Sequence, residues 1–510
     1  MADSAPANCS DALIGHGNTV RLLFNSLHSN APFIQHCQSM TLRKAPALAG
    51  PAMELPRRTS PRWTADAEDA IPEKLIKPWK LPRHNTYLFI NANVVDTAKG
   101  LVIKNTTVKI SNGLIESVGQ SSADSSGNDA IVVDLQGKYL SPGLIDCHVH
   151  VSSVPGEAGL NGGFNMDATV SHLRQSFVCG RILSKGFTTV RDTGGATLAL
   201  KEAIQDGVFP GPRLFIANQA LSQTGGHGDR RGAHDHSGLC CGGTAGLSNV
   251  VDGVPECIRA TREQLRTGAD FIKIMVGGGV ASPTDRIENT QFTADEIKAI
   301  SEVARSYGTW VTAHAYTPRA IRHAVENGVT GIEHGNFIDK ETAEFMAENA
   351  VWLTPTLVTY DAMGSDKYKG FLPPENQRKN QEVLERGLES LKIAATAGVT
   401  ICHGSDLLGP LQAEQSREFG IRQQALSNQQ VLQSATVNAA RMLRQEDVLG
   451  QVKEKFVADL LILNGNPLDD VSILDEPEKN VLAVIKDGRV YTSRWSKLPE
   501  DVKEPPRMIE

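Results

Sequence analysis

The chain has 510 residues, a hydrophobic fraction of 40%, a charged fraction of 21% and a formal net charge of −7. This composition is typical of a globular protein and argues against a nucleic acid or an anionic membrane surface as partner. No apolar run approaches the roughly 18 residues of a membrane-spanning helix. The eight cysteines form no CxxC pair, which favours a reduced, intracellular protein.

The N-terminal segment differs from the rest of the chain because it is rich in proline and shows no sustained apolar periodicity. Proline interrupts regular backbone hydrogen bonding, so we predict a poorly ordered arm or an extended strap over residues 1–83. The arm lacks the apolar core of a secretory signal peptide. We expect a cytoplasmic protein; Arg21 and Arg43 leave a mitochondrial transit peptide as the alternative, against which Asp3 and Asp11 count.

Strand-like segments lie on both sides of a long alternating region. They are rich in β-branched residues and are broken by glycine and asparagine. The segments are 87–96, 106–119, 129–143, 457–467 and 481–493. We predict that the early and late segments form one small, discontinuous β-sandwich domain of residues 84–142 and 443–495, followed by a C-terminal tail at 496–510.

From Gly143 onward, strand-like and helix-like segments alternate eight times along the chain. Several of the helical segments end in glycine, which is the usual helix stop. Eight such repeats are typical of a (β/α)8 barrel, whose usual size is about 250 residues. The sequence therefore predicts an α/β fold in which a TIM barrel of residues 143–442 is inserted into the β-sandwich domain.

Polar residues recur where the predicted barrel strands end. His148 and His150 alternate at the end of the first strand, so both should face the same side. His314 ends the fifth strand, His334 the sixth and Asp406 the eighth. A single histidine at a strand end is more often a hydrogen-bonded core residue, and a single aspartate before a helix is usually a cap. Because chemistry in such barrels gathers at this end, the complete set indicates a metal site instead.

Lys273 lies inside the apolar fourth strand, in the segment DFIKIMVGGG. A buried ammonium group must be neutralised, paired or chemically changed. A neutral amine can add carbon dioxide to give a carbamate, whose two oxygens can bridge two cations. The alternative is a lysine whose aliphatic stem packs in the strand while its ammonium reaches the barrel mouth.

Five short segments resemble the metal-dependent amidohydrolase superfamily: PGLIDCHVH, GADFIKIMVGGG, AHAY, IEHG and GSD. A sixth, VADLLILNGNPLDD, is similar to the return of the chain into the small β-domain, and the likeness covers residues 87–493. The segment ALSQTGGHGD looks most like the prolidase-like branch, which includes carboxypeptidases for N-acyl amino acids or dipeptides and the fungal ochratoxinase. The resemblance implies a metal-dependent hydrolase that forms a homo-oligomer.

The resemblance also implies two divalent ions, for which imidazole and carboxylate ligands favour zinc. One ion would be held by His148, His150, Lys273 and Asp406, and the other by Lys273, His314 and His334. The N6-carboxylated Lys273 would be the bridge between them. A one-metal deaminase of the same superfamily needs no lysine at this strand, so Lys273 favours the two-metal type.

These residues predict an amide hydrolase in which a metal-bridging hydroxide attacks the amide carbonyl. Asp406 is expected to take a proton from the water and deliver it to the leaving nitrogen. His227, in a glycine-rich loop, is expected to hydrogen-bond the substrate carbonyl oxygen as charge develops, and Tyr316 is expected to reach a substrate carboxylate. A merely structural role is the alternative for both His227 and Tyr316.

The predicted substrate is a small molecule, an N-acyl amino acid or a dipeptide-like amide, with ochratoxin-like amides included, and the predicted activity is carboxypeptidase-like. One alternative is a cyclic-amide or imidazolone hydrolase, which would use the same metal ligands in a different pocket. Another is a non-catalytic scaffold derived from such an enzyme, although scaffolds of that origin usually lose metal ligands.

Several other polar residues receive no chemical role. His172 and His323 lie in helical segments, and His234 and His236 lie in a glycine-rich loop, so all four are expected at the surface. His403 is expected to lie behind the metal ligands. Arg191 and Asp192 follow the second strand, and we expect them to pair with each other across the barrel mouth.

Overall fold

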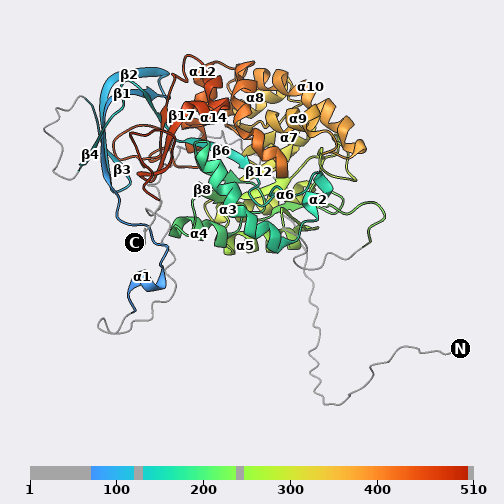
Figure 1. Ribbon diagram of the computed structural model, residues 1–510. Helices are drawn as coiled ribbons and strands as arrows, with labels where there is room; N and C mark the ends of the chain where they lie inside the picture. The colour runs from blue at the N-terminus through green and yellow to red at the C-terminus, as the bar shows by residue number, and fades with distance from the viewer. Residues whose placement is uncertain (1–70, 120–129, 237–245, 503–510) are drawn as a thin grey trace, which may run out of the picture. The chain divides into compact units, whose positions relative to one another are not determined.

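The structure is a computed structural model that describes residues 71–119, 130–236 and 246–502 (Figure 1). Most of the predicted N-terminal arm, residues 1–70, and the end of the predicted tail, residues 503–510, lie outside the described residues. The described part of the arm contains the short helix α1 (Glu73–Ile76). Directly after α1, Lys77 Nζ lies 2.8 Å from Asp206 Oδ2 in an exposed ion pair.

Strands from both ends of the described chain form one mixed sheet of eight strands. These strands are β1 (Thr86–Asp96), β2 (Leu101–Ser111), β3 (Leu114–Gly119), β4 (Ala130–Asp134), β5 (Tyr139–Pro142), β16 (Leu460–Leu463), β17 (Val481–Lys486) and β18 (Arg489–Ser493). The antiparallel pairing of β5 with β16, in which Leu140 lies opposite Ile462, joins the early strands to the late ones. Figure 1 shows the blue strands β1–β4 and the red strand β17 in this sheet. The predicted discontinuous β-domain is therefore confirmed as an architecture, while its boundaries stay a prediction.

Eight parallel strands of the described chain form the barrel wall. They are β6 (Leu144–Val149), β7 (Phe187–Asp192), β8 (Arg213–Ile216), β11 (Ile272–Met275), β12 (Val311–Ala315), β13 (Gly331–His334), β14 (Trp352–Thr354) and β15 (Thr400–Ile401). The short strand β9 (Ala220–Ser222) pairs with β11 and with β10 (Ser248–Val250). The Cys147 amide donates to the His403 carbonyl over 2.8 Å, which joins the two ends of the wall. This arrangement confirms the predicted TIM barrel.

Helices follow the barrel strands, and additional helices lie in the connecting loops. Those after the strands are α3 (Ala168–Ser184), α4 (Leu198–Asp206), α5 (Val254–Arg266), α6 (Ala294–Ser306), α7 (Pro318–Glu326), α8 (Lys340–Glu348), α10 (Pro374–Thr396), α12 (Asn428–Ser434) and α13 (Val437–Met442). The additional ones are α2 (Leu160–Phe164), α9 (Leu357–Gly364), α11 (Glu418–Gln423) and α14 (Pro477–Asn480), with 3-10 helices η2 (Asp366–Tyr368), η3 (Gly409–Arg417) and η4 (Val471–Asp475). None of the helices within these described ranges is long and apolar enough to cross a membrane.

Local sequence signals set where the outer helices begin. Helix α6 starts with a capping box, in which the Thr293 side chain accepts from the Glu296 amide and the Glu296 carboxylate accepts from the Thr293 amide. Helix α7 combines the N-cap Thr317 with Pro318 at its first position, where a missing N–H is harmless. The barrel strands β6, β7, β11, β12 and β13 are buried along their whole length, as expected for parallel strands covered on both faces.

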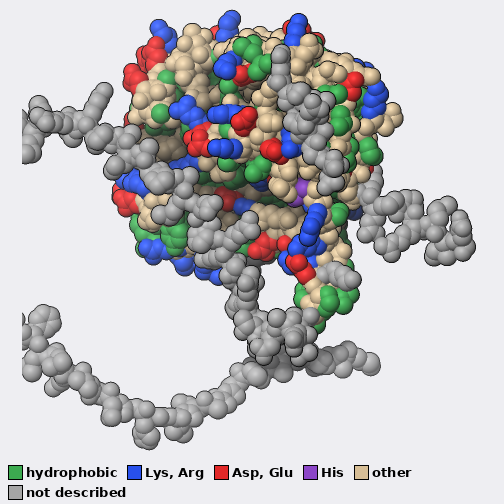
Figure 2. Space-filling model, turned by 90° about the vertical axis from the view of Figure 1, so that its left-hand side faces the viewer, with side chains coloured by type: hydrophobic (Ala, Val, Ile, Leu, Met, Phe, Trp, Pro, Cys, Tyr) green, Lys and Arg blue, Asp and Glu red, His purple; other side chains and the backbone are tan. Residues whose placement is uncertain are grey.

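Charged side chains of both signs are interspersed on the face shown in Figure 2. Exposed pairs such as Lys109 with Glu116, whose Nζ and Oε1 are 2.9 Å apart, belong to this kind of surface. Exposed ion pairs contribute only about 0–1 kcal/mol each. The fold is therefore held by its apolar core and by the few charges that lie inside it.

A buried ion pair links α11 to the barrel. Arg422 and Glu418 are both fully buried, and Arg422 Nε donates to Glu418 Oε1 over 2.6 Å. The same guanidinium donates to the carbonyls of Cys402 at 3.0 Å and Pro355 at 2.5 Å, while Glu418 accepts from the Val358 amide at 2.6 Å. This pair thus holds the segments after β14 and β15 together, directly behind the rim on which the predicted site residues lie.

We expect Arg422→Met to lower the free energy of unfolding by about 3–5 kcal/mol, because it leaves a buried carboxylate without its partner. The double variant Arg422→Met/Glu418→Gln should lose less than the sum of the two single losses, since it removes the orphaned charge as well. Denaturant unfolding followed by circular dichroism measures all four proteins. Strictly additive losses would show that the two side chains do not stabilise the fold as a pair.

Candidate metal centre

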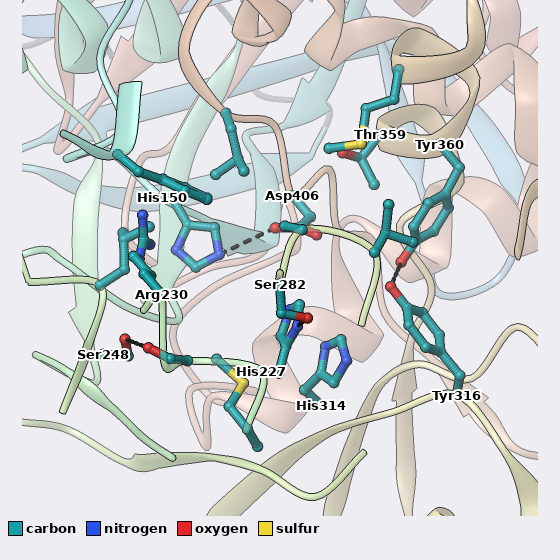
Figure 3. Close-up of a pocket in the computed structure, with 18 residues that line it drawn as sticks. His150, His227, Arg230, Ser248, Ser282, His314, Tyr316, Thr359, Tyr360 and Asp406 are labelled. Carbon is teal, nitrogen blue, oxygen red and sulfur yellow. Dashed lines mark hydrogen bonds and ion pairs between the residues drawn. The ribbon is translucent and has the colours of Figure 1, made fainter. Parts of the chain in front are cut away.

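The six predicted metal ligands lie in five of the barrel strands or in the segments that follow them. They are His148 in β6, His150 directly after β6, Lys273 in β11, His314 in β12, His334 in β13 and Asp406 in the segment after β15. Lys273 is 2% exposed, and the four histidines are also buried. Asp406 keeps 19% of its side chain exposed and faces the pocket shown in Figure 3. The rim predicted from the strand ends thus exists, although the role of each residue as a ligand stays a prediction.

Five of the six side chains converge on one another. His150 Nε2 lies 3.1 Å and His148 Nε2 lies 3.3 Å from Asp406 Oδ1, and His334 Nδ1 lies 4.0 Å from Asp406 Oδ2. The His314 ring joins them, with its centroid 4.6 Å from that of His334. Ligand atoms of His148, His334 and Asp406 all lie within 4.8 Å of one another, so these three could hold one metal ion.

Hydrogen bonds on the far side of three rings fix which nitrogen faces the cluster. His148 Nδ1 lies 2.8 Å from Glu333 Oε2, and His150 Nδ1 lies 2.8 Å from the Gly194 carbonyl. His314 Nε2 lies 3.1 Å from the Gly278 carbonyl. Because a carboxylate or carbonyl oxygen only accepts, these ring nitrogens carry the hydrogen, and the opposite nitrogen of a neutral ring keeps its lone pair. This arrangement is the one that histidine metal ligands adopt.

The cluster is rich in electron pairs and needs a cation. With their Nδ1 atoms donating, His148 and His150 would both direct Nε2 lone pairs at the same carboxylate oxygen of Asp406 unless a proton or a metal ion intervenes. Burial alone would raise the pKa of Asp406, but the charges and hydrogen bonds of His148 and His150 hold it well below its usual range. Burial opposes charge on His150 as well, yet Asp406 raises the pKa of that ring. Nitrogen and carboxylate donors in this number fit a zinc-like divalent ion.

Backbone strain occurs at two of these residues. His334 has φ of 74° and Asp406 has φ of 52°, in the left-handed region that side chains with a Cβ rarely adopt. Each such residue costs on the order of 1–3 kcal/mol and persists only where its surroundings enforce it. For Asp406 the constraint is visible, because its amide donates to the His148 carbonyl over 2.8 Å. The strain is thus located where two side chains must point at one centre.

Lys273 lies beside this cluster in the barrel interior. In the parallel pairing of β11 with β12, Lys273 is opposite Thr312, and Met275 is opposite His314. Burial lowers the pKa of Lys273 to about 8. Among the described residues, no hydrogen bond or ion pair is formed by its Nζ. Burial, the His227 ring and the Lys273 charge also hold the pKa of His314 well below its usual range, so that ring is neutral.

A buried carboxylate that the sequence analysis missed supports His148 from behind. Glu333 Oε1 accepts from Arg191 Nη2 at 2.6 Å and from the Thr312 hydroxyl, while Oε2 accepts from His148. Burial would raise the pKa of Glu333, but the Arg191 charge and the His148 hydrogen bond hold it well below its usual range. The sequence signal for Glu333 was its position, because an acidic residue inside a short apolar strand is unusual. The adjacent His334, a predicted metal ligand, made this signal easy to overlook.

The expected pairing of Arg191 with Asp192 is wrong. Arg191 is fully buried, points at Glu333 and donates through Nε to the Cys147 carbonyl at 2.5 Å. Asp192 instead accepts from three backbone amides, those of Val151, Gly194 and Ala196, at 2.8–3.0 Å. Successive residues of a strand point to opposite faces, so these two side chains cannot meet.

His227 contacts the cluster through His314, on whose ring it stacks with a centroid separation of 4.1 Å. Its Nδ1 lies 2.9 Å from Ser282 Oγ, which also donates to Asp285. A Cβ on Gly279 would lie 2.0 Å from the His227 ring, so glycine is required for this close approach. Burial and the Lys273 charge lower the pKa of His227 to about 3, so the ring is neutral. Figure 3 shows it beside His314 in the pocket.

Tyr316 lines the same pocket, but its hydroxyl already has a partner. Tyr316 OH lies 2.9 Å from Tyr360 OH, and Tyr360 OH lies 3.0 Å from His334 Nδ1. Thr356 Oγ1 is a second neighbour of the same nitrogen, at 2.8 Å. Burial raises the pKa of Tyr316, so it carries its proton. The two tyrosines thus connect the pocket wall to the cluster around Asp406.

Among the described residues, the other histidines named in the sequence analysis do not reach the cluster. His172, His234 and His236 are exposed, and His323 Nε2 lies 3.0 Å from the Phe292 carbonyl. His403 is fully buried, and its ring stacks on Phe419 with centroids 4.6 Å apart. Neither ring nitrogen of His403 has a hydrogen-bond partner within the described ranges.

Comparisons with known proteins agree with this architecture. The model of the Amidohydrolase family matches residues 139–491. The ochratoxinase of Aspergillus niger is 30% identical over 430 residues, which cover 79% of this chain and 86% of that protein. A solved prolidase, complexed with N-methylphosphonate-L-proline, is 41% identical, covers 81% of this chain and 100% of its own, and has a TM-score of 0.77. A Xaa-Pro dipeptidase with methionine bound in its active site is 30% identical, covers 80% of this chain and 100% of its own, and has a TM-score of 0.72. The chain therefore belongs to the amidohydrolase family, whose metal-dependent members act on carbon–nitrogen bonds.

Proposed function

We propose that the protein is a two-metal amide hydrolase that cleaves an N-acyl amino acid or a dipeptide in a carboxypeptidase-like reaction. The observation that carries the proposal is the convergence of the His148 and His150 Nε2 atoms on one oxygen of Asp406. The related prolidase and Xaa-Pro dipeptidase hold N-methylphosphonate-L-proline and methionine, respectively. A substrate with both apolar and polar parts also suits the pocket, whose lining combines apolar side chains with histidine, tyrosine, serine and charged side chains.

The proposed ligands of one ion are His148, His150, Lys273 and Asp406, and those of the other are Lys273, His314 and His334. Zinc is the proposed metal, and N6-carboxylation of Lys273 is the proposed bridge. The absence of any hydrogen-bond partner for Lys273 Nζ among the described residues supports the bridge, because an unpaired buried ammonium is costly whereas a carbamate between cations is paired. When bound, the two ions would polarise the amide carbonyl and lower the pKa of a water molecule to about 7.

Asp406 is the proposed proton carrier. Its low pKa keeps the carboxylate ionised, and its partial exposure lets it reach the reacting groups. It would take a proton from the attacking water and deliver it to the leaving nitrogen. His227 would donate from Nε2 to the substrate carbonyl oxygen, which requires the Ser282 hydroxyl to donate to His227 Nδ1. In the structure the one hydrogen of this hydroxyl is donated to Asp285, so the hydroxyl would have to turn towards His227 Nδ1, which lies 2.9 Å from its oxygen.

Glu333 is proposed as a positioning residue rather than a catalytic one. It holds the Nδ1–H of His148, so that Nε2 keeps its lone pair toward the cluster. Arg191 and Thr312 in turn hold Glu333. We expect Glu333 to determine metal affinity through His148 without touching substrate.

Glu333→Gln should weaken metal binding by about 10- to 100-fold, because the amide no longer offers an anionic acceptor to His148. Competition with a chromophoric chelator measures the affinity, and kcat/KM at saturating metal separates binding from catalysis. Glu418→Gln is the matched control, since Glu418 is also fully buried beside an arginine but lies away from the cluster. An equal effect of both variants on metal affinity would reduce the role of Glu333 to general stability.

Lys273→Ala should lower the metal content from two ions per chain to one or fewer and abolish turnover. A short-chain carboxylic acid should partly restore both, because it replaces the carbamate oxygens. Lys185→Ala is the control, since Lys185 is also buried with its pKa lowered to about 8, but its Nζ donates to the Gln412 carbonyl at 2.8 Å. Metal analysis and turnover of Lys273→Ala that match the wild type would contradict the bridge.

The substrate class is tested with the metal-loaded enzyme and a panel of amides. We expect turnover of N-acyl amino acids or dipeptides, with Xaa-Pro dipeptides and ochratoxin-like amides included, measured as release of free amino acid. Faster hydrolysis of cyclic amides or imidazolones would favour the alternative enzyme class. A protein that binds two ions and hydrolyses none of these compounds would be the non-catalytic scaffold.

A further inference from the structure

The barrel closes between β6 and the segment that follows β15, and three of the predicted metal ligands lie at this seam. Among the described strands, β6 pairs with β7 and β15 with β14, but β6 and β15 form no ladder with each other. Single hydrogen bonds join them instead, including those of the Ser405 and Asp406 amides to the His148 carbonyl, at 3.3 and 2.8 Å. A Cβ on Gly404 would lie 2.9 Å from that of His148, so glycine permits this close approach. The position of Asp406 therefore depends on a few contacts at the seam.

Asp146, in β6, is a side chain that spans this seam. Its carboxyl group is fully buried and accepts two hydrogen bonds on each oxygen. Oδ1 accepts from the amides of His148 and Ser405, at 3.1 and 3.2 Å. Oδ2 accepts from the Ser405 hydroxyl at 2.6 Å and from Gln415 Nε2, in η3, at 2.9 Å. One side chain therefore connects β6, the segment after β15 and η3.

The groups around Asp146 are arranged for these contacts and for no others. Within the described ranges, no lysine or arginine forms an ion pair with Asp146, although a buried carboxyl group is costly without a cation. Gln415 donates to Asp146 through Nε2, while its own Oε1 is buried without a hydrogen-bond partner in this part of the chain. Native proteins tolerate such unfavourable features mainly where function requires them. The seam is therefore a place where geometry takes precedence over stability.

We propose that Asp146 is a positioning residue for Asp406. Its hydrogen bonds hold the Ser405 amide and hydroxyl against β6, and this hold keeps the next residue, Asp406, in the left-handed region at φ of 52°. A residue with a Cβ leaves that region unless its surroundings enforce it. In this conformation Asp406 Oδ1 lies 3.1 Å from His150 Nε2, and the side chain faces the pocket, as Figure 3 shows. The consequence for catalysis rests on the role of proton carrier proposed above for Asp406.

Hydrogen exchange of the metal-free protein, followed by mass spectrometry, tests whether Asp146 holds the segment. Asp146→Ala removes all four contacts, so the amides of Ser405 and Asp406 should exchange at least about 10-fold faster, while those of β12 stay unchanged. Asp146→Asn should keep most of the protection, because its amide oxygen can still accept from both backbone amides. Asp459→Ala is the matched control, since Asp459 is also buried and accepts a backbone amide at 2.8 Å, but it lies directly before β16. Unchanged exchange at Ser405 and Asp406 in Asp146→Ala overturns the proposal.

Ser405→Ala provides the same test if Asp146→Ala does not fold. This variant removes one donor and introduces no large cavity. The amides of Ser405 and Asp406 should then exchange about 3-fold faster, because the hydrogen bond between the Ser405 hydroxyl and Asp146 is lost. Exchange at the wild-type rate in a folded Ser405→Ala protein counts against the hold.

Proton delivery is tested with the metal-loaded enzyme and two substrates, an N-acyl amino acid and the thioester in which sulfur replaces the leaving nitrogen. The amine needs a proton to leave, whereas the thiolate does not, because a thiol is far more acidic than an amine. Asp146→Ala should lower kcat for the amide at least about 10-fold more than kcat for the thioester. Asp459→Ala should leave the ratio of the two kcat values unchanged. Equal losses for both substrates in Asp146→Ala would overturn the positioning role.

Failure of this inference and failure of amide hydrolysis give different results. If the wild type cleaves neither substrate, the proposed hydrolysis fails, and the exchange measurement still decides whether Asp146 holds Asp406 in place. If the wild type cleaves both substrates and Asp146→Ala has wild-type exchange and a wild-type kcat ratio, the hydrolysis stands and the role of Asp146 is overturned.

Discussion

The crowding of electron-pair donors around Asp406 is the constraint on which the rest of the site depends. Lone pairs of His148 and His150 meet one carboxylate oxygen at 3.1–3.3 Å in a buried space. Such a group is unfavourable without a cation, so the protein must hold it in place by other means. The acceptors behind the rings and the left-handed φ of His334 and Asp406 do this. A cation at this position would offset the repulsion between the lone pairs.

The buried ion pair of Glu333 and Arg191 makes that arrangement possible. Glu333 is needed as the acceptor behind His148, but a carboxylate with no exposed surface requires a positive partner of its own. Arg191 supplies it and is itself fixed by the Cys147 carbonyl and by the face of Phe271, 5.2 Å from its guanidinium carbon. The barrel interior therefore contains a charge-balanced pair below the cluster, while Lys273 beside it has no such balance. For this reason the two buried cations differ. Arg191 stabilises the structure through its ion pair with Glu333, whereas the amine of Lys273 is not engaged and can react.

The parts of the site that follow from strand topology could be predicted from the sequence. Parallel strands bring their carboxyl ends to one rim, so His148, His314, His334 and Asp406 could be placed together before any contact was known. The roles of Glu333 and Ser282 could not be predicted from the sequence, because they depend on the face of the strand or loop to which each side chain points. Neither pattern nor motif distinguishes these faces where both are buried. The stacking of Arg230 on Phe164 joins a loop to the end of α2, 66 residues earlier in the chain, and no periodicity connects them.

His227 and Arg230 lie on one loop, and each is held by an aromatic ring from another part of the chain. His227 is fixed relative to the cluster by its stacking on the His314 ring in β12. Arg230 follows three residues later, and its guanidinium stacks on Phe164 at the end of α2. Because the two contacts are so close in the sequence, a movement of the loop would disturb both of them. The orientation of His227 in the pocket therefore depends on contacts with β12 and with α2 together.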